Sequence, residues 1–211
     1  MQVFLPRWSP DQKQIVFSLS IHSERTQNYL VSANGGIPQP VLPGDLDEGD
    51  PNWSPDGNSL VFSASFRNQG SLNILDLRTH KASVVPGSEG LFSPHWSPDG
   101  RYIIAMSYPG QNLMLFDFKT QKWSELTGIK AAFPNWSRGG NYVYFHSFGS
   151  QTALYRVRIS DHKLEKIVSL KGMRLTIGGW GAWCGLAPDD SPLVLRDVGS
   201  QEIYALDLQL P

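Results

Sequence analysis

Four polar residues stand directly before a tryptophan at regular intervals along the chain. They are Arg7, Asn52, His95 and Asn135. Side chains of these types donate and accept hydrogen bonds, so a ring of them could hold an anionic or peptidic ligand. The same positions could equally be solvated residues at the start of a strand. We take the four as candidate ligand-binding residues.

Other residues with chemical potential have simpler structural interpretations. His146 ends an apolar run and is expected to be a hydrogen-bonded core histidine. A single cysteine, Cys184, excludes an internal disulfide and is expected to be buried as a small hydrophobic residue. The acidic stretch 45–50 lacks the spacing of an EF-hand loop, so a solvated loop between repeat units is a better interpretation than a calcium site. We predict no metal site and no cofactor.

None of the common catalytic motifs is present in the sequence. There is no Gly-x-Ser-x-Gly nucleophile elbow, no phosphate-binding loop, no His-Glu-x-x-His zinc helix and no Gly-x-Gly-x-x-Gly dinucleotide motif. Asp189 and Asp190 are adjacent in a predicted turn, so their carboxylates point apart instead of across a substrate. We expect no catalytic residues and no enzymatic activity.

Composition restricts the partners and the compartment. The formal net charge is −1, and the 18 Lys and Arg residues are scattered, which argues against a nucleic-acid partner. No stretch reaches the roughly 18 apolar residues of a membrane span, and the first residues lack the pattern of a secretory signal. We expect no membrane contact by this segment. The compartment stays open: cytoplasmic if Met1 is the true start, and periplasmic or extracytoplasmic if the chain is part of a membrane-anchored regulator.

The tryptophans belong to a motif that repeats through the chain. Trp-Ser-Pro-Asp-Gly occurs at 53–57 and 96–100, near copies begin at Trp8 and Trp136, and a degenerate copy occupies 186–190. Proline presets one turn dihedral, aspartate caps the backbone, and glycine accepts a positive φ. We therefore assign a structural role in hairpin turns to Asp11, Asp56, Gly57, Asp99, Gly100 and Asp189.

Each unit has the pattern of four short strands separated by turns. Runs such as 59–63, 71–76 and 82–85 are rich in β-branched and apolar residues and are bounded by turn-forming residues. Four strands in a unit of about 40 to 45 residues are typical of a β-propeller blade. We predict an all-β fold, with residues 1–211 forming a single β-propeller of about five four-stranded antiparallel blades. The expected units are 1–45, 46–88, 89–128, 129–177 and 178–211.

The fifth unit is short of strands, so its blade is expected to be incomplete or the ring open. Its second strand is expected at 193–196 and its third at 202–207, with no outer strand after it. An open ring leaves unpaired sheet edges. Three arrangements fit: a five-bladed ring with a three-stranded last blade, an open arc that pairs with another copy, and a fragment of a ring of six or more blades.

In a propeller, the residues before the tryptophans are expected at the mouth of the central channel. A second set of equivalent positions lies near the end of each second strand: Ser18, Ser63, Met106, His146 and Arg196. Strand alternation could point this set toward the channel or toward a blade interface.

The units resemble the TolB-type, WD-repeat-like β-propellers of bacteria. The resemblance rests on Pro-x-Trp-Ser-Pro-Asp-Gly followed by an apolar strand, a polar loop and a strand that ends in aspartate, as at 51–76. The units are also similar to the propellers that precede prolyl oligopeptidase catalytic domains. The stretch 183–208 resembles the C-terminal propeller end of multidomain bacterial regulators, in which the propeller follows a DNA-binding winged helix or a Ser/Thr kinase domain.

The resemblance implies either a truncated relative or a fragment of such a regulator, and it does not indicate what the propeller binds. Analogy with other propellers favours a non-catalytic binding or interaction module that takes a protein, a peptide or a small ligand at the channel mouth. Such a module would be the sensory or scaffold part of a bacterial regulator, with self-association through unpaired blade edges as a further expectation. The alternative is an enzyme, such as a lyase, a glycosidase or a peptidase-associated protein, that uses the central channel as its active site. That alternative needs converging acid and base residues, so a structure with His95, His146 and a carboxylate together in one pocket would favour it.

Overall fold

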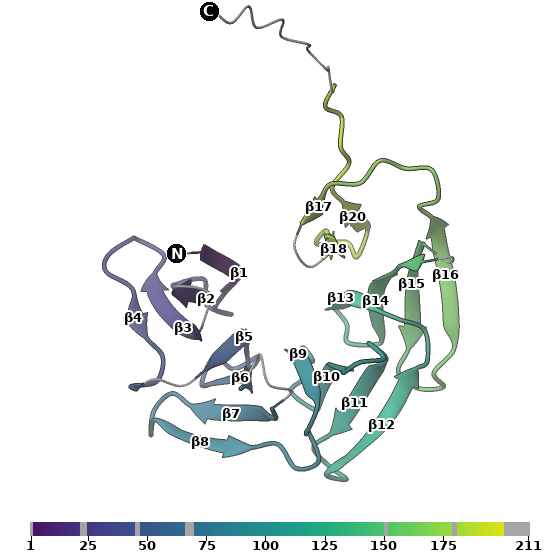
Figure 1. Ribbon diagram of the computed structural model, residues 1–211. Coiled ribbons are helices and arrows are strands. Elements are labelled where there is room, and N and C mark those ends of the chain that lie inside the picture. The colour runs from purple at the N-terminus through teal and green to yellow at the C-terminus, as the bar shows by residue number, and fades with distance from the viewer. Residues whose placement is uncertain are drawn as a thin grey trace, which may run out of the picture.

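The computed structural model describes residues 2–21, 25–44, 47–65, 70–149, 152–178 and 181–200. Most strands in these residues belong to four antiparallel sheets of four strands each, which we call blades 1 to 4 in chain order (Figure 1). In every blade the strands pair in the order in which they follow along the chain. Each blade is therefore a meander, as the repeated short strands predict.

The strand bounds follow the repeat. Blade 1 contains β1 (Gln2–Trp8), β2 (Gln14–Ile21), β3 (Arg25–Ser32) and β4 (Gln39–Pro40). Blade 2 contains β5 (Glu48–Trp53), β6 (Ser59–Ala64), β7 (Leu72–Asp76) and β8 (Lys81–Val84). Blade 3 contains β9 (Leu91–Trp96), β10 (Tyr102–Ser107), β11 (Leu113–Asp117) and β12 (Lys122–Thr127). Blade 4 contains β13 (Ala132–Trp136), β14 (Tyr142–Ser147), β15 (Ala153–Arg158) and β16 (Leu164–Ser169).

The blades stand around an arc with the first strand of each blade facing the centre (Figure 1). Blade 1 lies at one end of the arc. The other end carries two short hairpins, β17 (Ile177–Gly178) with β18 (Gly181–Ala182), and β19 (Cys184–Leu186) with β20 (Pro192–Val194). The third strand expected at 202–207 lies outside the described residues. The predicted all-β propeller of roughly five blades with an incomplete last blade is confirmed.

The core lies between successive blades, because alternate residues of a second strand point to opposite neighbours. On β6, Phe62 packs in one cluster with Val16 of blade 1. The adjacent Val61 packs in another cluster with Ile103 of blade 3. Burying each such side chain stabilises the fold by roughly 1.5–3 kcal/mol, so each blade depends on both of its neighbours.

Two of the motif tryptophans, Trp53 and Trp136, link the inner strands of neighbouring blades, whereas Trp96 Nε1 donates to the Gly100 carbonyl of its own turn. Trp53 Nε1 donates a hydrogen bond of 3.2 Å to the Arg7 carbonyl of blade 1. Trp136 Nε1 donates one of 3.0 Å to the His95 carbonyl of blade 3. Trp8, in the first blade of the described chain, is 59% exposed. Trp53 is buried against blade 1, and Trp96 and Trp136 are half-buried, so the indole is less exposed where a preceding blade covers it.

The turns after the tryptophans use the same hydrogen bonds in three blades. The hydroxyls of Ser9, Ser54 and Ser97 donate to Asp11, Asp56 and Asp99 at 2.7, 2.6 and 2.6 Å. Each aspartate oxygen also accepts a backbone N–H two residues farther on. Asp189 has no serine before it, but it accepts the N–H of Ser191 at 3.0 Å.

Positive φ angles occur where the turns place glycine. Gly57 and Gly100 have φ of 73° and 75°, which glycine adopts without steric cost. Gln12 and Asp190 take φ of 59° and 63° at the equivalent positions. The turn geometry is therefore kept even in the units that lack glycine.

Candidate functional site

A cavity of about 430 Å³ lies at the centre of the arc, where the inner strands of the blades converge. Its polar lining residues are Arg7, Asp50, Ser93, His95, Gln111 and Asn135. Apolar walls come chiefly from Phe92, Met106, Phe133 and Trp183. Three of the four candidate ligand-binding residues thus line one cavity, and Asn52 is not among its lining residues.

A repeated bulge shapes the inner strands around this cavity. The residue before each inner-strand proline has a positive φ: 52° at Leu5, Asp50 and Ser93, and 50° at Phe133. The pairing of inner and second strands shifts register at the same place in all four blades. Proline cannot donate to the ladder, so a bulge is where a strand accommodates it. All four bulge residues line the cavity.

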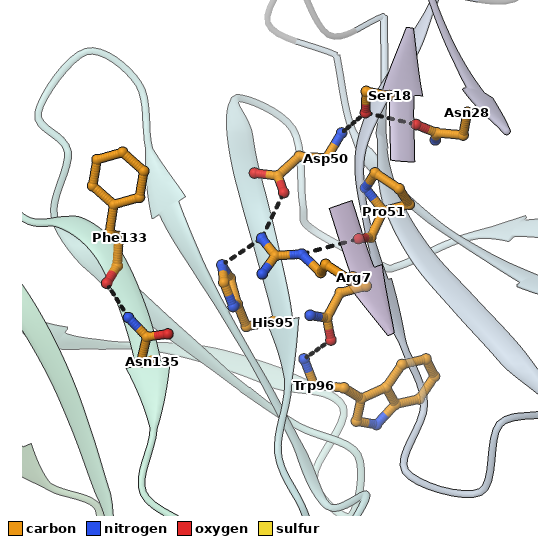
Figure 2. Close-up of polar contacts among 10 residues, drawn as sticks. Arg7, Ser18, Asn28, Asp50, Pro51, His95, Trp96, Phe133 and Asn135 are labelled. Carbon is orange, nitrogen blue, oxygen red and sulfur yellow. Dashed lines mark hydrogen bonds and ion pairs between the residues drawn. The ribbon is translucent and has the colours of Figure 1, made fainter. Parts of the chain in front are cut away.

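Arg7 is the centre of a polar network on one side of the cavity (Figure 2). Its Nη2 donates to Asp50 Oδ1 at 2.8 Å and lies 3.3 Å from His95 Nε2, and its Nε donates to the Pro51 carbonyl at 3.1 Å. Asp50 in turn donates its backbone N–H to Ser18 Oγ at 3.0 Å. One guanidinium therefore joins the inner strands of blades 1, 2 and 3.

His95 is buried and neutral in this network. Burial, reinforced by the positive charge of Arg7, holds its pKa well below the usual 6.5. Because a guanidinium can only donate, the Nε2 atom facing Arg7 is the acceptor, which assigns the ring proton to Nδ1. The lone pair of Nε2 is already occupied by Arg7.

The two asparagines also link inner strands. Asn52 Oδ1 accepts the backbone N–H of Trp96 in blade 3 at 3.0 Å. Asn135 Nδ2 donates to the carbonyl of Phe133 at 2.7 Å and to that of Cys184 in the following unit at 3.2 Å. The residue before each tryptophan therefore contacts the next blade, a role that the ligand-binding interpretation did not include.

The interpretation of two core residues is partly corrected. Cys184 is buried, its Sγ lies 3.5 Å from the Phe133 carbonyl, and burial raises its pKa to about 12, as expected for an unreactive core thiol. His146 is buried as predicted, and burial lowers its pKa. The expected hydrogen bonds of His146 are not found: neither of its ring nitrogens has a partner among the described residues. His146 is also not among the residues that line the cavity with His95.

The prediction of a solvated acidic loop at 45–50 is wrong for two of its residues. Glu48 and Asp50 lie in β5 and are 1% and 3% exposed. The inner strand begins earlier than the polar sequence suggested, so both carboxylates are packed between blades. Asp47 accepts the N–H of Thr26 at 3.1 Å, and residues 45 and 46 lie outside the described residues.

The second set of equivalent positions is in register in four blades. Ser18, Ser63, Met106 and His146 pair with Phe4, Gly49, Phe92 and Ala132 of the inner strands. All four are buried. Arg196 departs from the set: it forms an isolated bridge with Leu175 beyond the end of β20.

In the part of the chain that the structure describes, no three His, Cys, Asp or Glu side chains come together as metal ligands would. The same residues include no helix with the length and apolar character needed to cross a membrane.

Comparison with known proteins identifies relatives by fold. TolB from Acinetobacter baumannii matches with a TM-score of 0.71 and 22% identity, over 93% of this chain and 55% of its own. A putative TolB from Agrobacterium tumefaciens matches with a TM-score of 0.63 and 21% identity, over 75% of this chain and 62% of its own. An oligogalacturonate lyase solved with manganese matches with a TM-score of 0.65 and 15% identity, over 91% of this chain and 58% of its own.

The chain spans little more than half the length of the two TolB proteins, and identities at this level establish the fold alone. No curated protein matches the sequence. The model of the TolB beta propeller domain matches residues 2–173, which include all four complete blades. This chain belongs to the TolB beta propeller domain family.

Proposed function

We propose that this propeller is a non-catalytic binding module that takes a peptide segment of a protein partner, or a small ligand of similar chemistry, in the central cavity. The observation that carries the proposal is the pairing of an arginine network with an aromatic wall inside one cavity of about 430 Å³. Recognition sites combine a mostly apolar surface with a few placed polar groups, and this cavity has that composition.

The contacts of Arg7 define the ligand chemistry. Its side chain is 23% exposed, and its Nη1 group makes no hydrogen bond to the described residues. A ligand carbonyl or carboxylate could accept those N–H groups. Across the cavity, Trp183 is 40% exposed beside Phe133 and can cover an apolar side chain. Asp50 neutralises the positive charge of Arg7, so the cavity suits a peptide better than a polyanion.

The state of His95 supports binding without turnover. A general base must offer a lone pair to the proton it removes. His95 Nε2 faces Arg7 at 3.3 Å, so the bond between them would have to break before the ring could act on a substrate. We extend the proposal to the sensory or scaffold part of a bacterial regulator on the basis of the sequence resemblance at 183–208.

The test is selection of peptides from a displayed random library against the full chain, followed by calorimetric titration of the selected peptides. Arg7→Lys keeps the charge but loses the planar fork, and Trp183→Ala removes the apolar wall. Each should weaken binding by roughly tenfold or more. Arg78→Ala, in the exposed turn after β7, is the matched control and should bind like the unmodified chain. Equal binding by all three variants, or a failure to select any peptide, would contradict the proposal.

A further inference from the structure

Two buried positions between blades 1 and 2 carry polar residues where the other repeat units carry apolar ones. Five positions before the motif tryptophan, blades 1, 3 and 4 have Val3, Leu91 and Ala131, whereas blade 2 has Glu48. On the third strands, the residues paired with Ser63, Met106 and His146 are Leu72, Leu113 and Leu154. The residue paired with Ser18 is Asn28. Two apolar positions of the repeat are therefore polar at this one junction.

These two positions meet where one blade packs on the next, a surface that we call a joint. Leu72 and Leu91 belong to one core cluster at the blade 2–3 joint, and Leu113 and Ala131 to another at the blade 3–4 joint. At the blade 1–2 joint, Glu48 accepts the backbone N–H of Asn28 instead. Both residues are buried, at 1% and 0% exposure. A carboxyl group thus occupies a place that the repeat fills with hydrocarbon.

Neither polar side chain is fully satisfied. Glu48 Oε2 and Asn28 Nδ2 have no hydrogen-bond partner among the described residues. An unpaired buried carboxylate is far more costly than a neutral carboxylic acid. Burial accordingly raises the pKa of Glu48 to about 7, and the N–H of Asn28 offsets only part of that increase.

The charges around Glu48 do not supply a partner for its ionised form. The titratable residues on the strands packed against β5 are Arg7 on β1, Arg25 and Tyr29 on β3, and His95 on β9. Arg7 is committed to Asp50, and none of the four contributes to the raised pKa of Glu48. The flanking Asp47 and Asp50 are acidic and therefore offer no positive charge: Asp47 accepts the N–H of Thr26, and Asp50 is paired with Arg7.

We propose that Glu48 and Asn28 make the blade 1–2 joint proton-sensitive: the blades pack closely while the Glu48 carboxyl is neutral, and the joint loosens and hydrates when it ionises. The carboxyl group is buried where β5 packs on β3, so separation of these strands would admit water to the carboxylate. The blade 2–3 and 3–4 joints contain no titratable group at the equivalent positions, so the response is confined to one joint.

A chain of hydrogen bonds connects this joint to the central cavity (Figure 2). Asn28 Oδ1 accepts from Ser18 Oγ at 2.9 Å, and Ser18 Oγ accepts the Asp50 N–H at 3.0 Å. Asp50 then holds Arg7 at 2.8 Å. Loosening at Asn28 therefore reaches the Arg7 network through two intermediate residues. The proposal concerns the ligand-free chain and does not depend on what the cavity binds.

The experiment measures amide hydrogen exchange of the full chain at about pH 5 and about pH 8.5, corrected for the intrinsic pH dependence of exchange. The reporters are the N–H groups of Asn28 and Asp50. We expect their protection to fall by roughly tenfold or more at the higher pH. In Glu48→Gln, which keeps the shape but cannot ionise, the protection should stay high at both pH values. Glu89→Gln, which removes an exposed carboxylate, should behave like the unmodified chain.

If Glu48→Gln does not fold, the double variant Asn28→Leu/Glu48→Leu reproduces the residue pair of the blade 2–3 joint and should also be insensitive to pH. Unchanged protection of both amides in the unmodified chain would overturn the proposal. A pH-dependent fall that persists in Glu48→Gln, or in the double variant, would overturn it as well.

Discussion

The blade 1–2 joint and the two joints that follow it use the same backbone register and all bury apolar side chains, but they differ in chemistry at two equivalent positions. The later joints are held by buried leucines such as Leu72 and Leu113, which depend on neither pH nor precise partners. The first joint contains the buried polar pair of Asn28 and Glu48. The same fold can therefore provide rigid joints and a responsive one, and the difference lies in two residues.

The two sides of the cavity also differ in chemistry. Its side near the first joint carries the charged network of Arg7, Asp50 and His95. Its side near blade 4 is built from Phe133 and Trp183, and the amide of Asn135 is bound by backbone carbonyls. The first joint thus adjoins the polar half of the cavity, and blade 4 with the unit after it forms the apolar half.

The largest expected effect comes from placing the polar residue of the first joint into a leucine joint. In Leu113→Asn, a fully buried side chain loses its apolar contacts and gains an amide without partners. We expect the free energy of unfolding to fall by about 3–5 kcal/mol, as measured by urea denaturation. A loss below about 1 kcal/mol would mean that the two kinds of joint are interchangeable.

The pH dependence of stability should be the next largest effect. The pKa of Glu48 rises from 4.5 to about 7 on folding, so the folded chain holds this proton over a range in which the unfolded chain releases it. The contribution of Glu48 to stability is therefore largest below its unfolded pKa, falls as pH rises through the window from 4.5 to about 7, and is constant above that window. The total loss is at most about 3 kcal/mol.

This loss is measured as the difference in unfolding free energy between the unmodified chain and Glu48→Gln over a pH series. The difference removes the contributions of all other titrating groups. A difference that does not change with pH would show that Glu48 titrates normally in the folded chain.

Most of the fold could be predicted because the signals are local. The Ser-Pro-Asp-Gly turn requires only residues within a few positions of each other, and the hydrogen bonds of Ser54 and Asp56 recur with Ser97 and Asp99. The predicted strands at 59–63 and 71–76 accordingly correspond to β6 and β7 within one residue at their ends. The position directly before the tryptophan is defined by the same local motif, and it identified three residues that line the cavity: Arg7, His95 and Asn135.

The first joint could not be predicted in the same way. Glu48 stands in an acidic stretch that indicates a solvated loop, and its burial is imposed by β3 of the preceding blade. The available signal was a comparison of the units, since Asn28 and Glu48 replace leucine and other apolar residues at equivalent places. The bulge at Asp50 was signalled only by a proline inside a strand, and the φ angle of 52° depends on how the ladder accommodates it.

Replacing the polar pair should convert the first joint into one of the later type. The double variant Asn28→Leu/Glu48→Leu removes a buried carboxylate and restores hydrocarbon contact. We expect a gain of about 1–3 kcal/mol at about pH 8, measured by urea denaturation, because substituting a buried polar pair by packed apolar residues is often stabilising. Destabilisation at that pH would indicate that the joint lacks room for leucine or that the pair stabilises the fold.

The smallest expected effect comes from the turns after the tryptophans, and it should be the same in blade 2 and in blade 3. Ser54→Ala and Ser97→Ala each remove a hydroxyl that donates to aspartate and accepts the N–H of Ser59 or Tyr102. Each should lower the unfolding free energy by about 1 kcal/mol at any neutral pH, again by urea denaturation. Clearly unequal losses would show that the turns, and not only the joints, differ between blades 2 and 3.

The most direct test of the difference between the joints is a titration of the Glu48 side-chain carboxyl by carbon NMR, with the signal assigned by its disappearance in Glu48→Gln. The structure predicts a midpoint near 7, shifted upward from 4.5 by burial between blades 1 and 2. A midpoint near 4.5 would mean that water reaches this carboxylate in the folded chain. The first joint would then be no more responsive to pH than the leucine joints that follow it.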